Sequence, residues 1–381
     1  MPLRLATCAC PNWYVYMKDN PLWRANELGQ SVWLDDLSQG LLASGELRNL
    51  IRQDHVSGVT TNPSIFRAAL LDPAYASRLD QTRGPRVPSE LYEQLVIDHV
   101  RSAADELRET YDATAHYDGF VSVELTPRVA HDATATIAEA ERLWQRVARP
   151  NVMIKIPATA ETRSAVRHLV RKGVPVNVTL VFGLRRHQEV LNTFADALTD
   201  CVRAHESAAG LTCVISFFIS RLDAAIDPEL GRRGATKLVG LAAIAIARSA
   251  YHQWIDFAAS PRWQSLAAQG ARPPRLVWAS MSPKDPAYDP LKYVDALVMP
   301  GTIATLPLQT LTAFRRMGRP SLPLADDRGQ TRDVRNALQV AGIDLEEVAA
   351  KLEEDGLQKF AQAYDTTISG IDTHLRTVSL H

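Results

Sequence analysis

One lysine stands inside an otherwise apolar run, where a charged amine is costly to bury. Lys155 belongs to the segment NVMIKIPAT, and its apolar neighbours leave it little surface along which to reach water. Burial favours the neutral amine, the form that attacks a carbonyl carbon to make a Schiff base. The alternative is a lysine that extends to the surface, as most strand lysines do. The setting of Lys155 indicates a covalent nucleophile.

Two carboxylates lie at the ends of other apolar runs. Asp35 belongs to the segment SVWLDD, and Glu124 belongs to GFVSVEL. Carboxylates beside an activated lysine can serve as general acids and bases. Asp35 could instead cap the helix expected after it, but Asp36 fits the capping position better. Asp35 is therefore expected to point into the protein.

Neutral hydrogen-bonding side chains accompany these charged groups. Asn177 and Thr179 are two residues apart, so on a strand their side chains share one face. Thr60 and Asn62 precede a proline in GVTTNPSIF, where Asn62 could equally bond the local backbone of a turn. Each residue is weak evidence alone. Together with one lysine and two acids at the ends of apolar runs, they indicate an active site.

The elements that would position these residues are short apolar runs that alternate with amphipathic helical stretches. This alternation is typical of parallel βαβ construction. The eight candidate strands are 31–36, 57–61, 119–125, 151–156, 174–180, 211–217, 275–280 and 295–300. Eight such strands predict an α/β fold of one closed (β/α)8 TIM barrel, whose catalytic residues lie at the C-terminal strand ends. A doubly wound open sheet is the alternative.

Helices are expected between these strands and after the last of them. The predicted helices are 89–110, 132–147, 161–172, 183–205 and 235–258. We expect one domain over residues 1–381, with an N-terminal extension at 1–30 and a C-terminal helical appendage at 330–381. The appendage contains one or two amphipathic helices, which would pack outside the barrel and could also cover its mouth.

Composition limits the partners and the compartment. The 381 residues are 46% hydrophobic and 22% charged, and 42 basic against 43 acidic residues give a net charge of −1. This balance argues against a nucleic-acid or membrane surface but allows a small anionic ligand. The four cysteines, at positions 8, 10, 201 and 213, form neither a disulfide framework nor a zinc set. No signal peptide is recognised, so a cytoplasmic protein is expected.

No cofactor is expected either. The ten histidines fall mainly in predicted helices and loops, whereas a metal-dependent aldolase needs a histidine-rich set at strand ends. No glycine-rich phosphate loop is present. We therefore expect neither a metal nor a nucleotide cofactor.

The segments that carry these residues resemble the transaldolase family, and specifically its longer bacterial branch. The matching stretches, in family order from about residue 30 to 370, are WLDDLS, GVTTNPSIF, VSVEL, MIKIPAT, VNVTLVF, ISFFISRLD and WASMSPKDPAY. The resemblance implies a cofactor-free barrel enzyme of the pentose phosphate pathway. Such an enzyme transfers a dihydroxyacetone unit from sedoheptulose 7-phosphate or fructose 6-phosphate to an aldose phosphate.

The resemblance also implies catalytic roles for four residues. Lys155 would attack the ketose carbonyl, and Asp35 would take the hydroxyl proton during carbon–carbon cleavage. Glu124 with Thr179 would position a water molecule that shuttles protons. These assignments agree with the chemistry that the residue types allow.

Substrate-binding residues are implied in two groups. Those expected around the dihydroxyacetone unit are Thr60, Asn62, Asn177 and Ser216. The phosphate is expected at Arg221 and Lys284, with Ser280 alongside. A surface ion pair with Asp223 is the alternative for Arg221.

Phe218 bears on the fate of the three-carbon unit. The smaller related fructose-6-phosphate aldolases carry a tyrosine there, whose hydroxyl favours release, whereas phenylalanine favours holding the unit for transfer. The chain also departs from the family near the expected phosphate site, reading WASMSPKDP and MPGTIATLP. These changes allow an altered donor or acceptor in a specialised pathway.

Two other functions stay open. An aldolase that releases dihydroxyacetone to water would use the same barrel. A silent sugar-phosphate-binding barrel would be expected to lack Lys155, Asp35 or Glu124, yet all three are present. The expected partners are small sugar phosphates, with no nucleic acid or membrane, and the chain is expected to be a monomer or homodimer.

Overall fold

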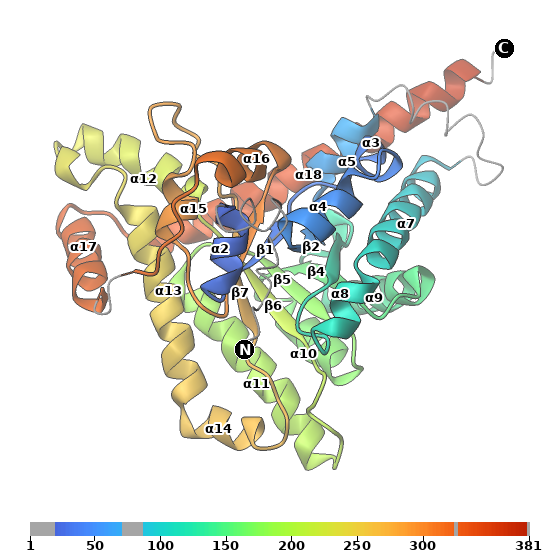
Figure 1. Cartoon of the computed structure of the whole chain (residues 1–381), viewed down its shortest axis with the longest axis horizontal. Helices are drawn as coiled ribbons and strands as arrows, with labels where there is room; N and C mark the ends of the chain where they lie inside the picture. The colour runs from blue at the N-terminus through green and yellow to red at the C-terminus, as the bar shows by residue number, and fades with distance from the viewer. Residues whose placement is uncertain (1–19, 71–86, 324–326, 379–381) are drawn as a thin grey trace, which may run out of the picture.

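The chain folds into a closed barrel of eight parallel strands (Figure 1). The computed structural model describes residues 20–70, 87–323 and 327–378, so most of the predicted N-terminal extension lies outside the described residues. The strands are β1 (Ser31–Leu34), β2 (Val56–Thr60), β3 (Phe120–Glu124), β4 (Val152–Pro157), β5 (Val176–Val181), β6 (Cys213–Phe218), β7 (Arg275–Ala279) and β8 (Ile303–Leu306). Each strand pairs with the next, and β8 pairs with β1, which confirms the predicted (β/α)8 barrel.

Helices surround the barrel and cover one of its ends. They are α2 (Pro21–Glu27), α3 (Gln39–Ala43), α4 (Glu46–Asp54), α5 (Pro63–Leu70), α7 (Pro88–Glu106), α8 (Arg108–Ala113), α9 (Ala133–Val147), α10 (Arg163–Arg171), α11 (Leu184–Arg203), α12 (Ser220–Arg232), α13 (Ala242–Ala259), α14 (Pro261–Ala267), α15 (Lys292–Ala296), α16 (Leu308–Met317), α17 (Arg328–Val340) and α18 (Leu345–Val378), with 3₁₀ turns η1 (Pro127–Val129) and η2 (Thr236–Leu238). Within the described ranges, no helix is long and apolar enough to cross a membrane.

The barrel interior is filled by alternate side chains of the strands, because successive residues of a strand point to opposite faces. A buried lumenal cluster includes Trp33, Met153, Val214, Val277 and Ile303, contributed by five different strands. The intervening residues face outward and pack against the helices. The lumen is thus a packed core at mid-height, so a ligand can enter only above it.

Buried polar residues close the N-terminal end of the barrel. Asp118 accepts hydrogen bonds from the Trp33 indole at 2.5 Å and from Ser31, and it forms an ion pair with Arg275 at 3.3 Å. The Arg275 guanidinium also lies 4.1 Å from the Tyr117 ring centroid. These charges have several hydrogen-bond partners, as buried charges require. The open end of the barrel is therefore the C-terminal one.

The predicted eighth strand at 295–300 is wrong. Residues up to Ala296 belong to α15, and the buried residues 297–299 lead into a turn at Pro300 and Gly301. The strand is β8, which begins at Ile303. Both segments are apolar and buried, so hydrophobicity alone does not separate them.

Other local predictions also need correction. The helix α12 is not among the predicted helices, and the helix expected to begin at residue 235 begins at Ala242, after η2. Asp36 is not a helix cap, because Ser38 occupies the N-cap of α3 and accepts the N–H of Leu41. A serine hydroxyl one residue before the helix satisfies a free backbone donor there.

The two C-terminal helices occupy different places. The helix α17 lies outside the barrel and packs on α13, whereas α18 packs on α5, α7, α12, η1 and the end of β5. Figure 1 shows α18 as the long helix that runs across the barrel end and continues toward the C-terminus. The elements α5, η1 and α12 follow the C-terminal ends of β2, β3 and β6. Because α18 packs on all three, it covers the mouth of the barrel.

Candidate active site

A small cavity of about 210 Å³ lies among the C-terminal strand ends. The predicted site residues that line it are Asp35, Thr60, Asn62, Lys155, Ser216, Phe218, Arg221, Ser280 and Lys284. The other three, Glu124, Asn177 and Thr179, are not among its lining residues and lie beside it on β3 and β5. The barrel thus gathers residues from distant parts of the chain, as expected for this end of such a fold.

Lys155 is buried at the centre of the site, with only 4% of its surface exposed. Its position on β4 is in register with Glu124 on β3 and with Asn177 on β5. The Nζ atom donates a hydrogen bond to the backbone oxygen of Thr61 at 2.9 Å and lies 3.2 Å from Oε1 of Glu124. The amine is therefore held at a fixed point of the cavity wall.

Glu124 is a carboxylate whose proton affinity is strongly shifted. Burial raises the pKa of Glu124 from 4.5 to about 7, although the neighbouring Lys155 opposes the shift. The Oε2 atom of Glu124 and the hydroxyl of Thr179 are buried without a hydrogen-bond partner among the described residues. A carboxyl group with a pKa near neutrality can both take up and release protons at physiological pH.

The chain is locally irregular where β5 carries Thr179. The pairing of β5 with β6 shifts register between Val178 and Val181, and Leu180 has a φ of 60° in the left-handed region. Left-handed backbone is unfavourable for a residue with a branched side chain, so the surrounding packing must hold it. The irregularity lies directly beside Thr179, whose hydroxyl is buried.

Asp35 is the second carboxylate of the site and is partly buried. Burial raises its pKa, while the nearby Lys155 and hydrogen bonds from Thr60 at 2.8 Å and Asn62 at 3.5 Å act in the opposite direction. The Thr60 hydroxyl also contacts that of Thr305 at 2.7 Å. Asp35 is therefore oriented by two neutral partners and keeps a proton more readily than an exposed aspartate.

The neutral residues form two groups. Asn177 is fully buried behind the cavity, where it donates to Ser122 at 3.0 Å and accepts from Ser216 at 2.7 Å. The side-chain oxygen of Asn62 accepts the backbone N–H of Ser64 at 3.0 Å, which confirms the local turn interpretation. The Asn62 amide nonetheless faces Asp35 and lines the cavity, so the turn does not prevent the predicted contact with a substrate.

Two cations lie together in the same cavity. Arg221 and Lys284 have no carboxylate ion-pair partner among the described residues, and burial lowers the pKa of both groups. The expected alternative for Arg221 is wrong, because Asp223 binds Lys292 at 2.8 Å and Tyr293 at 2.9 Å instead. Two neighbouring cations that are not ion-paired to a carboxylate suit a phosphate dianion.

Several lining residues were not assigned to the site from sequence. They are Ser64, Ala279, Ser282, Thr305, Pro307 and Phe360. Thr305 is not among the predicted site residues because the predicted eighth strand lies before β8. The β-branched residues Ile303 and Thr305 are two positions apart, which is the spacing of one face of a strand. Phe360 comes from α18, far along the chain, and nothing in its local sequence indicates the contact.

The arrangement defines a class of protein. It is a (β/α)8-barrel enzyme with a buried lysine amine, two neighbouring carboxylates and a cationic pocket at the C-terminal strand ends. Such a set can form a Schiff base with a phosphorylated carbonyl compound and move protons around it.

Comparison with known proteins identifies the family. Residues 32–371 match the model of the family described as transaldolase/fructose-6-phosphate aldolase. A Streptomyces avermitilis protein named Transaldolase 1 is 43% identical over 362 residues, covering 93% of this chain and 96% of that protein. Proteins named Transaldolase from Acidothermus cellulolyticus and Neisseria gonorrhoeae are 41% and 38% identical, covering 93% and 90% of this chain and 97% of each relative. The chain belongs to the transaldolase/fructose-6-phosphate aldolase family and is an enzyme of the transaldolase type.

Proposed function

We propose that this enzyme transfers a dihydroxyacetone unit from a ketose phosphate to an aldose phosphate through a Schiff base on Lys155. The observation that carries the proposal is the position of the buried Lys155 amine. It lies 3.2 Å from Glu124 and borders a cavity that also holds Arg221 and Lys284. The donors we propose are fructose 6-phosphate and sedoheptulose 7-phosphate.

The first half of the reaction attaches and cleaves the donor. Lys155 Nζ attacks C2 of the ketose, and a water molecule leaves as the C=N bond forms. Asp35 takes the proton of the C4 hydroxyl, the C3–C4 bond breaks, and an aldose phosphate departs. The bonding electrons remain on the three-carbon unit as an enamine. The raised pKa of Asp35 suits a group that must accept this proton and return it.

The second half reverses these steps on a new acceptor. The enamine carbon attacks the aldehyde of an aldose phosphate, and Asp35 returns the proton to the new hydroxyl. Water then hydrolyses the C=N bond and frees the amine. Glu124 and Thr179 are the proposed holders of that water, because both have buried oxygen atoms without a hydrogen-bond partner in the described structure.

Substrate binding is divided between the two ends of the cavity. We assign the hydroxyls of the three-carbon unit to Thr60, Asn62 and Ser216, and Asn177 supports Ser216 from behind. The phosphate is assigned to Arg221 and Lys284, with Ser280 beside them. Phe218 lines the cavity with an apolar ring where a tyrosine would place a hydroxyl, which favours transfer over release.

The remaining expectations are also proposals. We propose that the chain is one domain, with the N-terminal extension and the C-terminal helices as additions to the barrel. A cytoplasmic location fits the reduced, buried Cys201 and Cys213, because thiols stay reduced there. The oligomeric state is proposed to be a monomer or a homodimer.

Product analysis tests the proposed function. The protein is incubated with fructose 6-phosphate, with and without a four-carbon aldose phosphate, and the products are identified by NMR. Transfer predicts sedoheptulose 7-phosphate only when the acceptor is present, and without it no more than one equivalent of the three-carbon aldose phosphate per enzyme. Steady production of free dihydroxyacetone at the same rate without acceptor would instead identify an aldolase.

A further inference from the structure

The helix α18 is in contact with most of the elements that carry the site. It packs on α5, η1, the end of β5 and α12. These elements follow or contain Asn62, Glu124, Thr179 and Arg221, respectively. A single helix therefore spans the parts of the barrel mouth that bear the proposed catalytic and phosphate-binding groups.

Phe360 is the residue of α18 that enters the cavity. It lines the cavity, its surface is only 7% exposed, and its ring centroid lies 6.0 Å from Nζ of Lys155. An aromatic ring at this distance attracts a cationic nitrogen and presents no hydrogen-bonding group to water. The ring therefore forms an apolar cover over the nitrogen that would become the Schiff base.

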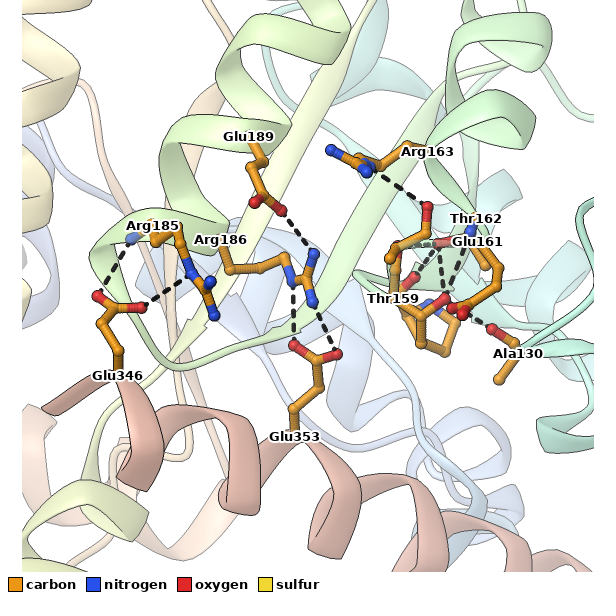
Figure 2. Close-up of polar contacts among 12 residues, drawn as sticks. Ala130, Thr159, Glu161, Thr162, Arg163, Arg185, Arg186, Glu189, Glu346 and Glu353 are labelled. Carbon is orange, nitrogen blue, oxygen red and sulfur yellow. Dashed lines mark hydrogen bonds and ion pairs between the residues drawn. The ribbon is translucent and has the colours of Figure 1, made fainter. Parts of the chain in front are cut away.

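The part of α18 before Phe360 is fixed by charged contacts to α11. Arg186 donates two hydrogen bonds to Glu353 at 3.1 and 3.2 Å and a third to Glu189 at 2.6 Å. Figure 2 shows both contacts, together with the neighbouring pair of Arg185 and Glu346. The Arg186 and Glu353 side chains are only 22% and 17% exposed, so this pair is shielded from much of the screening that weakens surface ion pairs.

Close packing fixes the same helix against β5. A Cβ atom added at Gly356 would lie 3.0 Å from Cδ2 of Leu180, so the helix approaches the strand end closely there. Leu180 follows Thr179 and is the residue with left-handed backbone. One turn later, Phe360 is thereby placed at a fixed height above Lys155.

We propose that Phe360 is a specificity-determining residue that keeps bulk water from protonating the enamine carbon beside the Lys155 nitrogen, so that the three-carbon unit is transferred rather than released. This inference rests on the proposed function. Release requires protonation of the enamine carbon, addition of a water oxygen to C2 and cleavage of the C2–N bond, which returns the amine and frees dihydroxyacetone. Transfer uses the same enamine carbon to attack an aldehyde, so the two outcomes compete for one intermediate.

The test measures this competition directly. Dihydroxyacetone released from fructose 6-phosphate without acceptor is compared with transfer to a four-carbon aldose phosphate, in the wild type and in Phe360→Ala and Phe360→Leu. We expect the release-to-transfer ratio to rise about tenfold or more in Phe360→Ala, equivalent to ~1.4 kcal/mol. Phe360→Leu keeps an apolar cover and should stay within about threefold of the wild type.

If Phe360→Ala is poorly folded, a variant that weakens the contact between α18 and α11 gives a second measurement. Glu353→Gln weakens the Arg186 contact and should raise the same ratio, whereas Glu354→Gln, one residue later and exposed, should not. A general loss of stability lowers release and transfer together and leaves their ratio unchanged. An unchanged ratio in both Phe360→Ala and Glu353→Gln contradicts the inference.

Different experimental results would contradict this inference and the proposed function. If the wild-type protein forms no borohydride-trapped adduct and performs no transfer, the proposed function itself is wrong. If the wild type forms the adduct and transfers, but the Phe360 and Glu353 variants release no more dihydroxyacetone, only the role of Phe360 is wrong.

Discussion

At the scale of single residues, the site depends on how burial changes proton affinity. Lys155 Nζ and Glu124 Oε1 lie 3.2 Å apart in the barrel, and the partly buried Asp35 lines the same site. Burial raises the pKa of both carboxyl groups, and the lysine opposes that shift in each. Burial and the neighbouring lysine thus act in opposite directions on both carboxyl groups, and for Glu124 the result is a pKa of about 7.

Asp35→Asn should separate Schiff-base formation from carbon–carbon cleavage. The amide keeps the shape of the side chain but cannot accept the C4 hydroxyl proton, so kcat should fall by about 10²–10⁴-fold. An adduct of the whole, uncleaved sugar should still be trapped by borohydride and seen by intact mass. Asp36→Asn removes the same charge from the adjacent residue, outside the cavity, and should retain nearly full activity. Wild-type turnover in Asp35→Asn would refute the assigned role.

Glu124 should control the acid side of the pH–rate profile. The pKa of Glu124 is raised to about 7, so the carboxylate that we propose to hold the hydrolytic water is lost as the pH falls through that value. The value of kcat should therefore decrease below about pH 7. In Glu124→Gln, kcat should be low at every pH and should not decrease further on the acid side, because glutamine does not titrate. Profiles measured from pH 5 to 9 with both proteins test this, and an identical acid limb in Glu124→Gln would rule out the assignment.

At the scale of elements, the site is built from loops and strand ends that different helices hold in place. Arg221 lies in the first turn of α12, shortly after the end of β6, and Lys284 lies in the loop after β7. The network of Asp223 with Lys292 and Tyr293 joins α12 to α15, which follows that loop. The two cations are therefore brought together by elements that are themselves linked by hydrogen bonds.

Arg221→Gln should weaken the use of phosphorylated donors specifically. A hydrogen bond to a charged group contributes ~1.5–3 kcal/mol, so kcat/KM for fructose 6-phosphate should fall about ten- to a hundredfold. The much lower activity with unphosphorylated fructose should change little. The matched control is Arg232→Gln, an exposed arginine at the far end of the same helix. Equal losses with both sugars would show that Arg221 does not recognise phosphate.

The close approach of β1 and β2 predicts a second pair of results. A Cβ atom at Gly58 would lie 2.4 Å from the Trp33 ring in the packed lumen, so Gly58→Ala should lower the free energy of unfolding by about 1–3 kcal/mol. Gly40→Ala, on the exposed face of α3 with no heavy atom within 4 Å of the added Cβ, should cause no loss. Denaturant unfolding curves measure both changes. Equal stabilities would mean that the lumen is less tightly packed than described.

The strands also show how much of the fold is predictable from the sequence. Seven of the eight predicted strands coincide with observed ones, because β-branched, apolar runs such as those of β4 and β5 strongly favour buried strands. The eighth is misplaced because an apolar turn before β8 has the same burial as a strand. The local pattern therefore predicts which segments are buried more reliably than it predicts their backbone conformation.

At the scale of the whole molecule, barrel closure brings together residues that lie far apart in the sequence. Asp35 after β1 and Lys284 after β7 line one cavity because β8 pairs with both β1 and β7. The strand-end residues could be predicted because every parallel strand of a barrel ends at the same rim. Phe360 could not, since its contact depends on where a distant helix crosses that rim.

The central claim is that Lys155 forms a Schiff base with a ketose phosphate, and trapping that intermediate tests it most directly. The protein is incubated with fructose 6-phosphate and, separately, with sedoheptulose 7-phosphate. Borohydride is added, and the intact mass is compared with that of Lys155→Met, which keeps the length of the side chain but removes the amine. We predict a mass gain of one reduced three-carbon unit in the wild type and no gain in a folded Lys155→Met. The same adduct or full turnover in Lys155→Met, or no adduct with either sugar in the wild type, would contradict the account.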